Sequence, residues 1–128
     1  MRSMTISART YEITQVAARA VIEKLGTDLV AIDLSDQLVL SEVFLITTGQ
    51  NVAQVDAIAD EVERQLLAIG EKTARREKGA EWILLDYSDL VVHVQSTDLR
   101  KYYMLDRLWN DCPTIELVAV KEAAVNGR

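Results

Sequence analysis

The residues of this chain that could perform chemistry are few, and they are not grouped as catalytic sites require. The sequence holds one histidine, His93, and one cysteine, Cys112. Structural zinc sites need clustered Cys and His ligands, and no context supports this pair as a thiol nucleophile with its base. Asp86 and Asp89 bracket a turn, whereas two-acid metal sites place carboxylates two residues apart on one strand face. The sequence therefore predicts no metal, no cofactor and no enzymatic activity.

One stretch is a candidate ligand site. Residues 47–51, Thr-Thr-Gly-Gln-Asn, leave a predicted strand and enter a predicted helix, where exposed backbone amides bind anions. Nucleotidyltransferases use a similar glycine and hydroxyl step, but the acids that such enzymes need are missing. A nucleotide-binding or nucleotidyltransferase-like enzyme is therefore the alternative function.

The stretch of residues 81–109 organises the rest of the chain. Two apolar runs, 82–85 and 90–94, flank a polar quartet at 86–89, which predicts two β-strands joined by a tight turn. The Ser-Thr pair after the second strand predicts the start of a short helix.

Large amphipathic side chains crowd into this stretch. It contains both tryptophans, three of the four tyrosines and the histidine. Trp and Tyr dominate interface hot spots, so the crowding predicts a recognition surface. Trp82 is either an exposed anchor or part of the hairpin core. His93 is predicted to be a hydrogen-bonding residue on a half-exposed sheet face, and Trp109 is predicted to be a core or dimer contact.

Hydrophobic periodicity places other elements around this hairpin. The predicted elements are helices at 13–25 and 51–69 and strands at 27–34 and 43–48. Gly26 and Gly70 are predicted to end the two helices, and Asn51 with Gln54 forms a capping box. The link between the two strands is too short for a helical crossover, which predicts antiparallel pairing. The charged residues 71–79 predict a solvated loop or an edge strand protected from aggregation.

Composition and charge restrict the class of protein. A chain of 128 residues with 49% hydrophobic residues fits one domain, predicted at residues 1–112, with a C-terminal tail at 113–128 that is flexible or a short strand. No apolar run is long enough for a membrane span, and residues 1–7 lack the core of a signal peptide, so we expect a cytoplasmic protein. The net charge of −6 favours a basic protein partner over direct, sequence-specific nucleic-acid binding.

The hairpin and the helix after it carry a specific combination of residues. The hairpin residues are Glu81, Trp82, Leu84, Asp86, Tyr87, Asp89, Val92 and His93, and those after it are Arg100, Tyr102, Tyr103, Leu105, Asp106, Leu108 and Trp109. This combination resembles the ribosomal silencing factor family, RsfS, also called Iojap-like proteins. The resemblance covers about residues 10–109. Ser88 stands where the family commonly has glycine, so the turn must avoid or tolerate a positive φ, and Gln50 and Val52 differ from the usual helix entry.

The resemblance implies a fold, a function and a partner. The implied fold is α+β, a mixed sheet flanked by helices that resembles a nucleotidyltransferase scaffold without the catalytic acids. The implied function is translational repression, in which the factor binds the large ribosomal subunit through its ribosomal protein fourteen and blocks joining of the small subunit. A role in large-subunit assembly and a homodimeric state are also implied. The candidate partner-binding residues are Glu81, Trp82, Asp86, Tyr87, Ser88, Asp89, His93, Arg100, Tyr102 and Tyr103.

Overall fold

The fold is a five-stranded mixed sheet flanked by helices on both faces. The computed structural model describes residues 6–37 and 41–125. The elements are α1 (Ala8–Glu23), β1 (Thr27–Asp33), β2 (Val43–Gly49), α2 (Val52–Ala68), β3 (Arg75–Lys78), β4 (Trp82–Asp86), β5 (Leu90–Ser96), α3 (Thr97–Tyr103), α4 (Leu105–Leu108) and α5 (Val118–Val125). The strand order is β1-β2-β5-β4-β3, with β2 and β5 parallel and the other neighbouring pairs antiparallel. The predicted α+β class, the hairpin and the antiparallel β1–β2 pair are confirmed.

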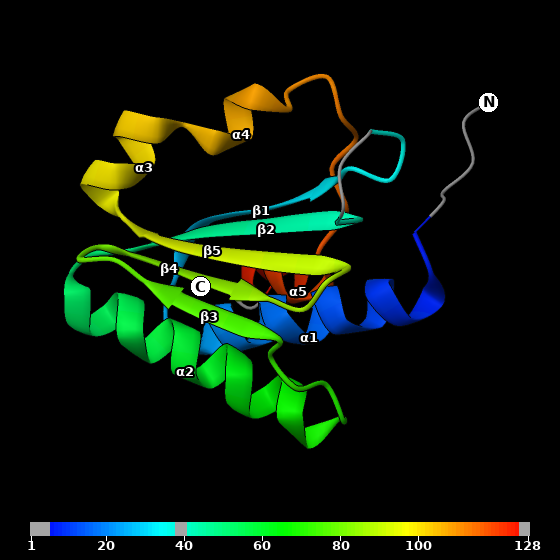
Figure 1. Ribbon diagram of the computed structural model, residues 1–128, viewed down its shortest axis with the longest axis horizontal. Coiled ribbons are helices and arrows are strands. Elements are labelled where there is room, and N and C mark those ends of the chain that lie inside the picture. The colour runs from blue at the N-terminus through cyan, green and yellow to red at the C-terminus, as the bar shows by residue number, and fades with distance from the viewer. Residues whose placement is uncertain (1–5, 38–40, 126–128) are drawn as a thin grey trace.

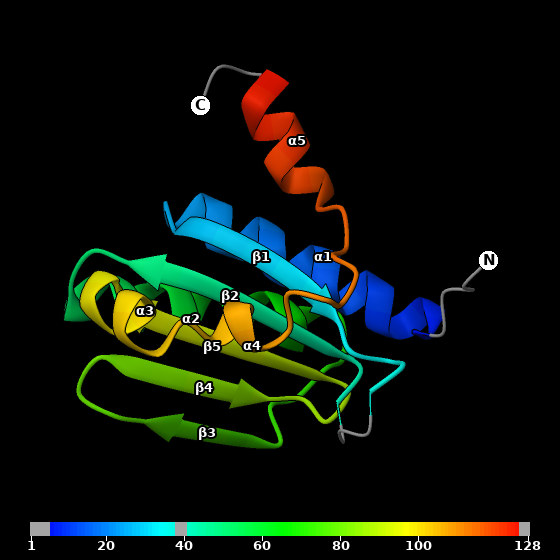
Figure 2. The ribbon, with the colours of Figure 1, turned by 90° about the horizontal axis from the view of Figure 1, so that it is seen from above.

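The helices cover the two faces of the sheet unequally. α1 and α2 pack side by side against one face, and α3 and α4 lie across the other (Figure 1). Seen from above, α3 and α4 lie over the middle of the sheet and leave β3 and β4 uncovered (Figure 2). Side chains of β4 on that face are therefore available to a partner. β3 is the charged edge strand that residues 71–79 suggested.

The main core lies between the sheet and the α1–α2 pair. Successive strand residues point to opposite faces, so every second residue of the central strands enters this core. The buried strand residues are Val43 and Leu45 of β2, Ile83 and Leu85 of β4, and Leu90, Val92 and Val94 of β5. A smaller cluster on the other face joins Ile32, Leu34 and Ile46 to Phe44, Leu105 and Trp109. Trp109 is thus a core contact that fastens the end of α4 to the sheet.

Helices α1 and α2 end in the same hydrogen-bond pattern with different residues. In α2, Gly70 has φ +88°, its N–H donates to the Leu67 carbonyl, and the next N–H donates to the Leu66 carbonyl. In α1 the positive φ of 63° falls on Leu25, and the N–H of Gly26 donates to the Val21 carbonyl. Gly26 lies at the end of α1 as predicted, but the left-handed conformation falls on the residue before it.

Gly26 is needed for a different reason, which is close packing. A Cβ at Gly26 would lie 2.5 Å from Val21 Cγ1 and 2.9 Å from Thr47 Oγ1. Glycine at position 26 therefore allows the close contact between α1 and β2. The left-handed conformation falls on Leu25, which is 75% exposed.

Replacing Leu25 by glycine is expected to raise the free energy of unfolding by about 1 kcal/mol, because an L-residue in the left-handed region is strained by about 1–2 kcal/mol. Urea denaturation measures this change. Gly70→Ala, the reverse exchange at the matched position of α2, is expected to lower the free energy of unfolding. A destabilising Leu25→Gly would contradict the strain assigned to Leu25.

Residues 109–125, which follow α4, form neither a strand nor a free tail. The Asp33 N–H donates to the Pro113 carbonyl and the Ile115 N–H donates to the Ala31 carbonyl, so these residues meet the edge of β1 only briefly. The chain then turns into α5, whose first N–H, that of Val118, donates to the Gln15 side chain of α1. This cap from α1 fixes the start of a helix in a segment that the sequence left open as flexible or a short strand. Like the other helices of residues 6–37 and 41–125, α5 is too short or too polar to cross a lipid bilayer.

Candidate protein interface

Alternation along β4 sorts the hairpin side chains onto the two faces of the sheet. Ile83 and Leu85 point into the main core. Trp82, Leu84 and Asp86 point to the opposite face, where they are only half-buried. The first strand of the hairpin therefore presents two apolar groups and a carboxylate in one line.

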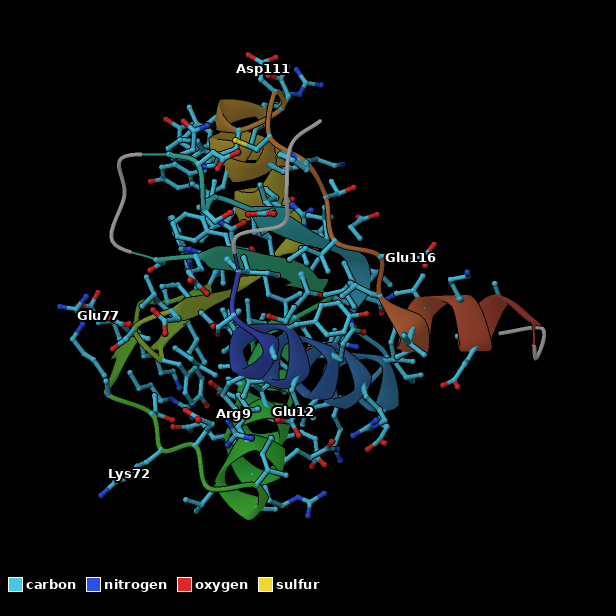
Figure 3. The ribbon with its side chains drawn as sticks, turned by 90° about the vertical axis from the view of Figure 1, so that its right-hand side faces the viewer. Arg9, Glu12, Lys72, Glu77, Asp111 and Glu116 are labelled. Carbon is cyan, nitrogen blue, oxygen red and sulfur yellow. The ribbon has the colours of Figure 1, made fainter. Side chains whose placement is uncertain are left out.

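A shallow depression lies beside these residues at the edge of the sheet. Its volume is about 380 Å³, and it is lined by Glu77, Lys78, Gly79, Trp82 and Leu84. The Glu77 side chain points outward from β3, away from the helical layers (Figure 3). The charged edge strand thus borders the apolar pair on β4, as a polar rim borders the apolar centre of an interface.

Six rings form a continuous row across this face. In order they are Trp109, Phe44, His93, Trp82, Tyr103 and Tyr102, with centroids of neighbouring rings 4.8 to 6.4 Å apart. The row starts in the small core under α4 and ends in solvent, where Tyr103 is 50% and Tyr102 is 79% exposed. We call Trp82, Leu84, Tyr102 and Tyr103 the aromatic surface. Rigid aromatic side chains that are held at one end and exposed at the other are typical of interface anchors.

Hydrogen bonds at the end of β5 hold α3 in place beneath these tyrosines. The Ser96 hydroxyl caps α3 by accepting from the Leu99 N–H, and it donates to the Glu81 carboxylate at 2.7 Å. Arg100 donates to Thr48 Oγ1 at 3.0 Å and pairs with Asp106 at 3.5 Å. The Arg100 side chain is only 11% exposed, so it supports the surface from inside and does not itself present a charge to a partner.

Arg100→Met is expected to lower the free energy of unfolding by about 1–2 kcal/mol, because it leaves the buried Thr48 hydroxyl without its donor. Thr48→Val is expected to cost about 1 kcal/mol, and the double variant to cost less than the sum of the two. Urea denaturation of the three variants measures the coupling. Strictly additive losses would contradict the bond between Thr48 and Arg100 as the connection that holds α3.

His93 is more buried than the sequence suggested. Its side chain is 5% exposed between Phe44 and Trp82, and its Nδ1 accepts a hydrogen bond from the Trp82 indole at 3.3 Å. Its Nε2 has no partner among the described residues. Burial disfavours the charged imidazolium and lowers the pKa of His93 to about 4. His93 is therefore a neutral ring that supports Trp82 from below, and the expected half-exposed position is wrong.

The acidic candidates differ in what their carboxylates already contact. Glu81 accepts from the Ser96 hydroxyl, and Asp86 accepts from the Ser88 N–H at 2.8 Å, with Arg75 at 3.8 Å. The Asp89 side chain is exposed and makes no such bond within residues 6–37 and 41–125. Ser88 has φ +72°, so the turn tolerates the left-handed conformation without a glycine, with Asp86 accepting from its N–H.

Tyr87 does not belong to the aromatic surface. It is 6% exposed within the main core, on the α2 side of the sheet, and its hydroxyl accepts from Thr73 Oγ1 at 3.1 Å. Burial raises the pKa of this phenol above its ordinary value. The expectation that Tyr87 anchors a partner is corrected, because alternation along β4 places it on the same side as Ile83 and Leu85. The same alternation in β2 would have pointed to Phe44, which the sequence analysis missed.

At the candidate anion site, the start of α2, the protein's own side chains accept from two of the backbone amides. Asn51 Oδ1 accepts from the Gln54 N–H at 2.8 Å, which confirms Asn51 as the cap, whereas Gln54 Oε1 accepts from the Gln50 N–H at 2.6 Å, one residue before the N–H that a capping box uses. The Gln54 amide also donates to the Lys24 and Leu25 carbonyls, tying α2 to the end of α1. Among the described residues, no group of three His, Cys, Asp or Glu side chains is placed to hold a metal ion.

Comparison with known families agrees on one group of proteins. A family model described as "Ribosomal silencing factor during starvation" matches residues 7–128. The ribosomal silencing factor RsfS of Halalkalibacterium halodurans is 39% identical over 111 residues, which cover 85% of this chain and 95% of that protein. RsfS of Bacillus subtilis is 37% identical over 107 residues, covering 82% of this chain and 91% of that protein. The chloroplastic protein Iojap of Zea mays is 30% identical, with 78% of this chain and 44% of that protein covered.

Two solved structures share the fold. A crystal structure of a Chromobacterium violaceum protein superposes with a TM-score of 0.75 at 32% identity, covering 78% of this chain and 85% of that chain. A crystal structure of a Bacillus halodurans protein superposes with a TM-score of 0.73 at 38% identity, covering 84% of this chain and 99% of that chain. The two bacterial relatives are named as ribosomal silencing factors, a regulatory role.

Proposed function

Because this chain belongs to the ribosomal silencing factor family, RsfS, and acts in translation regulation, we propose that it binds the large ribosomal subunit through ribosomal protein fourteen. The bound factor occupies the subunit-facing surface of that protein and prevents the small subunit from joining. Translation then falls when nutrients are scarce.

The observation that carries this proposal is the row of rings that ends in the exposed Tyr102 and Tyr103. Their side chains are 79% and 50% exposed, although aromatic side chains of this size are usually more buried. Tyr103 packs against Trp82, Tyr102 packs against Tyr103, and Leu84 lines the same depression as Trp82, so one partner can cover the whole aromatic surface. Buried aromatic anchors of this kind supply most of the binding energy of a protein interface.

The charges around the aromatic surface fit a basic ribosomal protein. The chain carries a net charge of −6, and Asp86 continues the line of Trp82 and Leu84 along β4. Asp89 adds an exposed carboxylate at the turn of the hairpin. In the proposed complex these acids meet basic side chains at the rim, where they speed association and fix orientation.

Sedimentation of purified ribosomal subunits with the added protein tests this function. The protein is expected to migrate with the large subunit and to reduce the fraction of joined ribosomes. A pull-down with isolated ribosomal protein fourteen identifies the direct contact. Absence of the protein from the large-subunit fraction would overturn the proposal.

From the family we also propose a scaffold related to nucleotidyltransferases that lacks their catalytic acids. The start of α2 supports this view, because the Asn51 and Gln54 side chains accept from the Gln54 and Gln50 amides, two of the donors that a phosphate would otherwise use. Calorimetric titration with common nucleotides and magnesium is expected to show no heat of binding. Measurable affinity that is lost in Asn51→Ala would favour the nucleotide-binding alternative.

A further inference from the structure

A second surface lies on the other side of α3 and α4 from Trp82. It is an open depression of about 330 Å³ lined by Asp28, Arg100, Lys101, Met104, Asp106 and Arg107. This depression thus gathers three cationic side chains, Arg100 and Lys101 of α3 and Arg107 of α4, although the whole chain is acidic.

Two of these cations are not neutralised by the protein. Arg100 is paired with Asp106, but Lys101 and Arg107 are exposed and have no ion-pair partner in the described part of the chain. Most other cations of the described residues are paired with an acid. The paired cations are Arg9, Arg64, Arg75, Arg76, Lys78 and Lys121. The one other unpaired group in the depression is Asp28, which leaves an excess of one positive charge there.

The proposed protein partner does not explain these two cations. A basic ribosomal protein would be repelled by an unpaired lysine and arginine close to the aromatic surface. Most of the surface that surrounds a ribosomal protein is RNA, whose phosphates are the strongest acidic groups available. An acidic factor also needs local cations to approach a polyanion at all.

We propose that Lys101 and Arg107 contact ribosomal RNA phosphates next to ribosomal protein fourteen, while the aromatic surface contacts that protein. This inference rests on the proposed function. The contacts are to the RNA backbone, so they add affinity without reading a base sequence. They divide the large-subunit site into a protein half on the β4 side of α3 and an RNA half on the β1 side.

The test compares wild type with the double variant Lys101→Gln and Arg107→Gln. Binding is measured to purified large subunits and to isolated ribosomal protein fourteen over a range of salt concentrations. Each phosphate contact adds about 0.7 to 0.9 to the slope of log affinity against log salt. Two contacts predict that the ratio of wild-type to variant affinity for the large subunit falls about tenfold between about 50 and 200 mM salt. Affinity for the isolated protein is expected to stay unchanged.

The matched control is Arg19→Gln with Lys72→Gln. It removes the same charge from two exposed cations that also lack ion-pair partners within residues 6–37 and 41–125. Lys72 lies at the other end of the molecule from Asp111, which follows α4 (Figure 3). A control that changes the salt slope as much as the test variant would overturn the proposal, because net charge alone would then explain it. If the test variant loses as much affinity for isolated ribosomal protein fourteen as for the large subunit, Lys101 and Arg107 contact that protein and not RNA, and the proposal is overturned. If wild type binds large subunits but not isolated protein fourteen, the proposed protein contact fails while the RNA contact is still read from the salt slope.

Discussion

Replacing Tyr102 and Tyr103 together by alanine is expected to weaken binding to the large ribosomal subunit at least about thirtyfold, which is about 2 kcal/mol. Both rings are exposed in the free protein and are buried against the partner in the proposed complex, so their truncation removes contact area at the centre of the proposed interface. Tyr102 is 79% exposed and contacts Tyr103 by ring packing, so its loss changes folding little. Titration of subunits followed by sedimentation gives the affinity, and thermal unfolding gives the stability.

Tyr11→Ala is the matched control for this result. Tyr11 is 41% exposed on α1, which covers the opposite face of the sheet, so it is expected to bind like wild type. Equal affinities for the tyrosine pair variant and wild type would remove the aromatic surface from the proposed interface. Trp82→Ala is a weaker test, because Trp82 also supports His93 and Tyr103 and its truncation lowers folding stability as well as binding.

The second large effect is on stability below neutral pH, and it comes from His93. The folded protein holds the pKa of His93 near 4, whereas the unfolded chain has the ordinary value of 6.5. Between these two values the unfolded chain binds a proton that the folded protein does not. The contribution of neutral His93 to the free energy of unfolding is therefore fully present above pH 6.5. The free energy of unfolding falls as the pH drops from 6.5 toward 4, by up to about 3 kcal/mol.

Urea denaturation at stepped pH values, beside the variant His93→Phe, isolates this contribution. Phenylalanine keeps a ring between Phe44 and Trp82 but cannot bind a proton. The difference between the two curves is expected to change across pH 4 to 6.5 and to be flat above it, since every other titrating group is shared. A constant difference between the two proteins at every pH would mean that folding does not lower the pKa of His93, as expected for a hydrated imidazole.

Local sequence patterns were sufficient for most of the elements around the site. The apolar runs on either side of residues 86–89 predicted the hairpin, and the Asn51–Gln54 pair predicted the start of α2, because turn and capping chemistry involves residues close in sequence. Tyr87 was misplaced although the alternation of Ile83 and Leu85 indicated its side of the sheet. Tyr87 was assigned to the interface because tyrosine is common at interfaces, although the alternation of side chains along the strand placed it in the core.

The support of the candidate site could not be predicted in this way. Arg100 and Thr48 are 52 residues apart, and their bond exists only because β2 and β5 pair in parallel. The burial of His93 depends on the same pairing, which places Phe44 of β2 beside it. Leu25 takes a strained conformation because its neighbour Gly26 is required for packing against Val21 and Thr47. In each case a contact between distant segments overrides the local preference.

The row of six rings also allows binding to be followed by intrinsic tryptophan fluorescence. It contains both tryptophans of the chain, Trp82 beside the exposed tyrosines and Trp109 in the small core under α4. Indole emission depends on the polarity and the groups around the ring. A partner that covers the aromatic surface changes the emission of Trp82, while Trp109 supplies a constant background within the same molecule. Intrinsic fluorescence can therefore follow docking in real time without any attached label.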